Sequence, residues 1–167
     1  KKIHLVATGG TIASQAKSRV STEGYTPSVI SVDDLIAQIP ELSELAEMSA
    51  EQIFLKPSSM ITEEDLFDLS DRVNELLASD DCDGVVITHG TDTMAYAAAT
   101  LYYLIQNSPK PVVLTGSQVS IYARDTDARE NLRNAITYAA DDDACGIHLV
   151  FDNKVICANR AQKTRTR

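Results

Sequence analysis

Residues 84–92 read GVVITHGTD, a short apolar run that stops on a histidine, a glycine and two polar residues. The run GVVIT lacks the alternation of apolar and polar residues that marks a strand with one wet face, so it predicts a strand buried on both faces. The next segment, TMAYAAATLYYLIQN at 93–107, is typical of a helix. A buried strand followed by a helix is the repeating unit of a parallel sheet.

Similar units extend from this stretch in both directions along the chain. Helical patterns follow Ser31 and Thr62, and another covers residues 125–140. KVICAN after Asn153 is typical of a short hairpin partner for the run before it. Apolar runs of strand length lie at 3–8, 53–56, 84–88, 111–116 and 146–151. We therefore predict an α/β fold, a mostly parallel sheet with helices on both faces.

The composition narrows the class of function. The 167 residues are 44% hydrophobic and 23% charged, which is ordinary for one globular domain. A net charge of -9 argues against a nucleic-acid partner. No apolar stretch is long enough to span a bilayer, so no membrane partner is expected. Cys82, Cys145 and Cys157 form no CxxC pair, and this usage favours a reducing, cytoplasmic location.

Small, hydroxyl-rich residues follow four of the predicted strands. They are TGGT at 8–11, PSS at 57–59, THGTD at 88–92 and TGSQ at 115–118. In open α/β sheets, ligands bind beyond the carboxyl ends of the strands, where the strand order reverses. We therefore expect these four segments to converge on one ligand site.

TGGT does not fit a phosphate site. A dinucleotide fingerprint counted from Gly9 would need glycines where Thr11 and Ser14 stand, and no Gly-Lys-Ser/Thr motif opens a helix. The glycines instead permit positive φ and close approach of a ligand to the backbone. Thr11 would then present its hydroxyl at the turn, as a nucleophile that is weak until a base removes its proton. No cofactor or metal is expected, and His89 is interpreted as a structural hydrogen-bonding residue.

The candidate partners for such a hydroxyl are few. Tyr25 lies in a polar loop, and Lys163 lies in the basic C-terminal segment. Asp92 either orients a lysine ammonium or accepts the α-ammonium of an amino-acid ligand. Ser58 and Ser59 are placed to donate to an α-carboxylate. Together these groups suit a small zwitterion that carries an amide.

At these residues the sequence resembles a known family. ATGGTIA, VVITHGTDTM, KPVVLTG and NRAQKTRT are similar, in this order, to segments of the bacterial-type L-asparaginases and glutaminase-asparaginases. The resemblance implies that residues 1–167 form the family's flavodoxin-like N-terminal domain, without its smaller C-terminal domain. It also implies a homo-oligomer in the full-length form, and poor activity for residues 1–167 alone, because the second domain brings an acidic residue across a subunit interface.

The resemblance further implies catalytic roles. Thr11 would be the acylated nucleophile, with Tyr25 as its partner from a loop. Thr91, Lys163 and Asp92 would form a second relay, in which Lys163 is the base for Thr91.

The resemblance assigns the substrate as well. Ser58 would contact its carboxylate and Asp92 its ammonium, with Ser59, Gly90 and Thr91 completing the substrate-binding set. The implied reaction is hydrolysis of the side-chain amide of L-asparagine, with L-glutamine as a second substrate, to the acid and ammonia. Two alternatives remain open: an amino-acid-binding module without turnover, and the ammonia-releasing subunit of a tRNA-dependent amidotransferase. The combination of two threonines with a lysine favours the enzyme, because a binding module needs no base.

Overall fold

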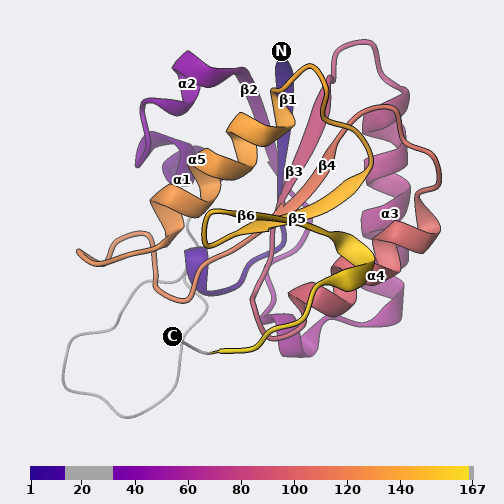
Figure 1. Ribbon diagram of the computed structural model, residues 1–167. Coiled ribbons are helices and arrows are strands. Elements are labelled where there is room, and N and C mark those ends of the chain that lie inside the picture. The colour runs from indigo at the N-terminus through magenta and orange to yellow at the C-terminus, as the bar shows by residue number, and fades with distance from the viewer. Residues whose placement is uncertain (14–31, 166–167) are drawn as a thin grey trace.

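A six-stranded sheet forms the middle layer of the computed structural model, which describes residues 1–13 and 32–165 (Figure 1). The strands are β1 (Lys2–Ala7), β2 (Glu47–Gln52), β3 (Gly84–Thr88), β4 (Val112–Thr115), β5 (Ile147–Phe151) and β6 (Lys154–Cys157). Their order across the sheet is β2-β1-β3-β4-β5-β6. The first five pair in parallel and β6 pairs antiparallel to β5. The predicted α/β class is confirmed.

Helices cover both faces of the sheet, as predicted. One face carries α3 (Glu63–Ala78) and α4 (Met94–Leu104). The other carries α1 (Val32–Ala37), α2 (Leu42–Leu45) and α5 (Ala128–Ala139) (Figure 1). Three short 3-10 turns complete the described elements: η1 (Thr11–Ala13), η2 (Ser58–Met60) and η3 (Ala158–Arg160).

The central strands are buried on both sides, so each face of the sheet has its own apolar core. In β1, Leu5 packs into the core under α1, α2 and α5, whereas Val6 packs into the core under α3 and α4. All five residues of β3 are buried. Full burial of one aliphatic side chain contributes about 1.5–3 kcal/mol. The apolar run that predicted this strand is therefore the main source of its stability.

Helix α3 begins where the sequence predicts. Thr62 is its N-cap and forms a capping box with Asp65, each side chain accepting a hydrogen bond from the other's backbone amide. Lys56 holds the same Asp65 carboxylate at 2.7 Å, and this hydrogen-bonded cation lowers the pKa of Asp65. The start of α3 is thus tied to the chain segment that follows β2.

The strand predicted at residues 53–56 is wrong, because β2 lies just before it, at Glu47–Gln52. β2 pairs only with β1 among the described residues, and its exposed and partly buried side chains alternate for most of its length. Such a half-exposed strand needs few apolar residues, so a search for continuous apolar runs overlooks it. Residues 53–56 continue alongside the end of β1 through hydrogen bonds from Ile53 N to Ala7 O (3.0 Å) and from Lys56 N to Thr8 O (3.2 Å).

The predicted hairpin partner is confirmed as β6. The β5–β6 turn places Asp152 and Asn153 at positive φ (50° and 56°), a conformation that these two residue types tolerate well. The helix predicted after Ser31 is observed as α1, but Ser31 itself lies outside the described residues. In the described ranges, no helix has both the length and the apolarity needed to cross a membrane.

The topology fixes where a ligand would bind. The chain passes from β1 to β2 on one side and then returns to β3 on the other side of β1. The strand order therefore reverses between β1 and β3. The carboxyl ends of both strands lie at the lower end of the sheet as drawn in Figure 1. This is the position at which α/β sheets of this kind bind ligands.

Candidate active site

The loops that follow β1 and β3 meet backbone to backbone. Gly10 has φ +88°, and a Cβ atom built on it would lie 2.6 Å from both the Cα and the N atom of Gly90. A Cβ atom on Gly90 would in turn lie 2.7 Å from the Oγ atom of Ser58. Three of the hydroxyl-rich strand ends are therefore in contact, and no side chain fits between them.

Hydrogen bonds lock these loops together. Thr8 donates to Thr88 O from both its amide (3.1 Å) and its hydroxyl (2.8 Å), which joins the ends of β1 and β3. Lys56 N donates to Thr8 O at 3.2 Å. Thr93 Oγ1 donates to Ser58 O at 2.9 Å, which ties η2 to the start of α4. These hydrogen bonds therefore join the loops after β1 and β3, the segment after β2 and the turn η2.

Thr91, Asp92 and Lys163, two of them in the loop after β3, form a hydrogen-bonded triplet beside these contacts. The Lys163 ammonium donates to Thr91 Oγ1 at 3.0 Å and to Asp92 Oδ1 at 2.7 Å. Thr91 is 9% exposed, whereas the Asp92 side chain is 73% exposed. The Lys163 ammonium thus lies between the exposed Asp92 carboxylate and the nearly buried Thr91 hydroxyl. After losing a proton, the same lysine nitrogen can accept the proton of that hydroxyl.

The other predicted site residues differ in their placement. Thr11 is the first residue of η1, directly after Gly10, and is partly exposed. Ser58 is buried at the start of η2, whereas Ser59 beside it is exposed. Tyr25 lies outside the described residues.

Sequence reasoning assigned no role to Gln118, yet the hydroxyl of Thr91 donates to its Oε1 atom at 3.4 Å. Asp127, at the N-cap of α5, holds the loop that carries Gln118. Its carboxylate accepts from the amides of Gln118 (2.9 Å) and Val119 (3.0 Å) and from Asn131 Nδ2 (3.1 Å). The segment TGSQ was recognised as a strand end, but no local pattern indicates this remote anchor.

His89 is fully buried under the site. Its amide donates to Thr115 O at 2.9 Å, and its Nδ1 donates to Gly90 O at 2.8 Å. Burial lowers the pKa of the imidazole, which therefore stays neutral at pH 7. No group of three potential metal-ligating side chains occurs in the described part of the chain.

This architecture defines a class: doubly wound α/β domains, here with threonine hydroxyls and one lysine ammonium at the strand switch point where such domains bind ligands. The comparison with known proteins identifies the family. Residues 2–167 match the family Asparaginase, N-terminal, and the chain belongs to it.

The chain is similar to several curated asparaginases. It is 40% identical over 166 residues to L-asparaginase 2 of Bacillus subtilis, and this match covers 98% of this chain and 44% of that protein. It is 37% identical over 161 residues to the glutaminase-asparaginase of Pseudomonas aeruginosa, with 95% of this chain and 44% of that protein covered. The chain therefore spans less than half the length of these relatives.

A crystal structure gives the same result for the fold. The probable cytoplasmic L-asparaginase of Campylobacter jejuni superimposes with a TM-score of 0.89 at 37% sequence identity. The match covers 99% of this chain and 50% of that one.

Proposed function

We propose that this protein is an L-asparaginase-type amidohydrolase, which cleaves the side-chain amide of L-asparagine, and also of L-glutamine, and releases ammonia. The observation that carries the proposal is the contact of the Lys163 ammonium with both Thr91 and Asp92, beside the meeting point of the loops after β1 and β3. The names of the relatives, L-asparaginase and glutaminase-asparaginase, support this substrate class.

In the first half of the proposed reaction, the Thr11 hydroxyl attacks the amide carbon and a Thr11 ester forms. The amide nitrogen takes a proton and leaves as ammonia, with Tyr25 as the partner of Thr11 in this step. Backbone amides at the glycine turns are the donors for the oxyanion of the tetrahedral intermediate. One such donor contributes about 3–4 kcal/mol to the stability of the transition state.

In the second half, water attacks the Thr11 ester. Thr91 and a neutral Lys163 act as the base that takes the proton from this water. The bond between Thr11 Oγ1 and the acyl carbon then breaks, a proton returns to Thr11 Oγ1, and the acid product leaves. Asp92 holds the lysine and accepts the α-ammonium of the substrate. Ser58, with Ser59 and Gly90, contacts the α-carboxylate.

Three broader features belong to the same proposal. Residues 1–167 act as the N-terminal domain of the family, and the full-length protein assembles as a homo-oligomer. The location is the cytoplasm. The name of the Campylobacter jejuni protein supports this location, and so do the free thiols of all three cysteines, each of which lies in the described part of the chain.

The test measures ammonia release from asparagine and from glutamine by the full-length protein, because residues 1–167 alone are expected to be poorly active. We expect Thr11→Ala to abolish it and Lys163→Met to lower kcat by about 10²–10⁴-fold, the usual contribution of a positioned acid or base. Lys154→Met is the matched control, because Lys154 is an exposed lysine that pairs with Asp152 rather than with Thr91 or Asp92. Wild-type turnover by Thr11→Ala would contradict the assigned nucleophile. A change confined to KM in Lys163→Met would make this lysine a binding charge rather than a base.

A second readout separates the alternatives. Asparagine should raise the melting temperature of the Thr11→Ala variant, because that variant retains the binding groups. If asparagine raises the melting temperature of the wild-type protein but no ammonia appears, the protein is better interpreted as an amino-acid-binding module. Ammonia release that requires a second protein and its tRNA would instead support the amidotransferase subunit.

A further inference from the structure

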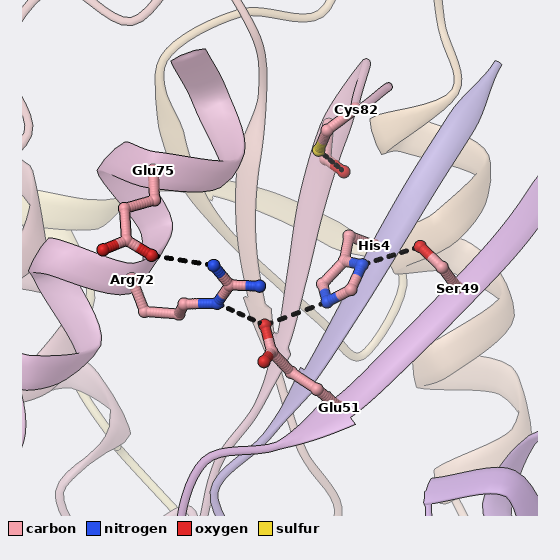
Figure 2. A network of polar contacts seen from close by, with 7 residues as sticks. His4, Ser49, Glu51, Arg72, Glu75 and Cys82 are labelled. Atoms are coloured by element: carbon pink, nitrogen blue, oxygen red, sulfur yellow. Dashed lines mark hydrogen bonds and ion pairs between the residues drawn. The ribbon is translucent and has the colours of Figure 1, made fainter. Parts of the chain in front are cut away.

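A second cluster of reactive side chains lies away from the strand ends, where β1 and β2 face α3 (Figure 2). The hydroxyl of Ser49 lies 2.6 Å from His4 Nδ1. On the other side of the ring, His4 Nε2 lies 3.0 Å from Glu51 Oε1. A hydroxyl, an imidazole and a carboxylate thus form one continuous hydrogen-bonded line.

Strand register explains why these three side chains meet. His4 of β1 is the direct partner of Ser49 of β2, and Glu51 follows two residues later on the same strand. Side chains two residues apart point to the same face of a sheet, so Ser49 and Glu51 flank the imidazole on one face. Here that face is the one covered by α3, because Arg72 of α3 donates from Nε to Glu51 Oε1 at 2.8 Å.

The hydrogen bonds fix the state of the neutral imidazole. An ionised carboxylate only accepts, so the proton of neutral His4 resides on Nε2, which donates to Glu51. Nδ1 is then an acceptor, and the Ser49 hydroxyl donates to it. This is the tautomer that a general base needs beside a nucleophilic hydroxyl. Arg72 also donates from Nη1 to Glu75 at 2.7 Å, which fixes the guanidinium that holds Glu51.

The cluster is accessible to reagents. Ser49 is exposed, and the His4 side chain is 15% exposed. Glu47 N and Ile53 N donate to Lys1 O and Ala7 O of the neighbouring strand. By the two-residue repeat of a strand, the amide of residue 50, which follows the serine, points away from β1.

We propose that Ser49 is a second nucleophile of this protein, with His4 as its base and Glu51 as the positioning residue, and that it reacts with small activated esters. The Ser49 oxygen bonds to the ester carbonyl carbon while its proton passes to His4 Nδ1. The alcohol or phenol leaves with that proton, and an acyl-Ser49 ester remains. Water then attacks this ester, His4 takes and returns one proton, and the carboxylic acid is released. The Ala50 amide, which points away from β1, is the one donor assigned to the oxyanion in this proposal, so unactivated esters react slowly.

The experiment uses two probes on the intact protein, p-nitrophenyl acetate and a fluorophosphonate that modifies activated serines. Mass spectrometry of proteolytic peptides measures modification at Ser49 and, as an internal control, at Ser43. Ser43 is also an exposed serine, but its hydroxyl donates to a backbone carbonyl, Pro40 O, at 2.8 Å. We expect modification at Ser49 to be at least about 100-fold faster than at Ser43, in line with the usual contribution of a general base.

Variants test the role of each residue in this hydrogen-bonded line. His4→Gln should lower the modification rate of Ser49 to that of Ser43, and Ser49→Ala should remove the burst of p-nitrophenol. Glu51→Gln should lower the rate at saturating probe more than tenfold and leave half-saturation unchanged, because it disturbs the tautomer of His4 and not the access of the probe. Circular dichroism checks the fold of each variant. Thr11→Ala should leave Ser49 modification unchanged, which separates this site from the proposed asparaginase site.

Equal modification of Ser49 and Ser43 would overturn the proposal. An unchanged Ser49 rate in a folded His4→Gln variant would also overturn it, because the serine would then react without its base.

Discussion

The close approach of the two site loops can be tested by adding one methyl group. In Gly10→Ala the new Cβ atom would lie 2.6 Å from the backbone of Gly90, at a residue whose φ is +88°. Two separate costs arise, strain from the left-handed backbone and overlap with the facing loop. The strain costs about 1–2 kcal/mol in the free energy of unfolding. Overlap in a well-packed region adds about 1–3 kcal/mol.

Gly146→Ala is the matched control. Gly146 also has positive φ (+70°), but the nearest atom to its added Cβ would be 3.9 Å away, in His148. Strain and the change in unfolded-state entropy are therefore shared by the two variants and cancel in the difference. The difference of about 1–3 kcal/mol measures the overlap alone. Gly90→Ala supplies the complementary case, because its Cβ overlaps the Ser58 side chain at 2.7 Å.

Urea unfolding followed by far-UV circular dichroism measures the effect, since the chain has no tryptophan to report by fluorescence. With an m-value of about 2 kcal/mol/M, the midpoint of Gly10→Ala should fall about 0.5–1.5 M below that of Gly146→Ala at an unchanged m-value. Equal midpoints would refute the reasoning, because they would mean that the loops after β1 and β3 are not in contact.

Two further predictions concern charge and thiols. Because its partner Lys56 lowers the pKa of Asp65 in the folded state, this carboxylate stabilises the fold above its unfolded pKa of about 3.9, and the contribution is lost as the pH falls through the folded value. In Asp65→Asn, the free energy of unfolding should therefore fall less steeply with decreasing pH below about pH 4 than in the wild type. An unchanged pH dependence in this range would contradict the ion pair. In thiol titration without reductant, Cys145, which is exposed, should react in the native protein. Cys82 should react only after unfolding, since burial raises its pKa, and denatured protein should titrate Cys157 as a third free thiol.

The fold could be predicted largely from buried apolar runs and from a helix cap. The apolar runs of β3, β4 and β5 and the cap of α3 at Thr62 each carry a local signal strong enough to define the element. β2 was not predicted because its side chains are all exposed or only partly buried, and its sequence EMSAEQ resembles a loop. A strand of this kind is defined by its partner β1 rather than by its own composition.

The candidate site, too, could be predicted only in part from the sequence. The convergence of the strand ends follows from topology, and glycines between hydroxyl residues mark where backbones approach. The contact of Lys163 with Thr91 spans 72 positions, and no local pattern encodes it. Resemblance to a family predicts the pairing of these two residues, and in the structure they lie 3.0 Å apart. The anchoring of the Gln118 loop by Asp127 was missed because an aspartate at the start of a helix is explained equally well by capping alone.

Lys163 lies beyond the last strand, so during translation it leaves the ribosome after the whole sheet. A growing chain carries Thr11 and Thr91, and the strands that place them, before it carries the ammonium that bonds to Thr91. An unfinished chain would therefore present the Thr91 hydroxyl before it carries the lysine that bonds to it, so Lys163 is the last part of the triplet to be synthesised.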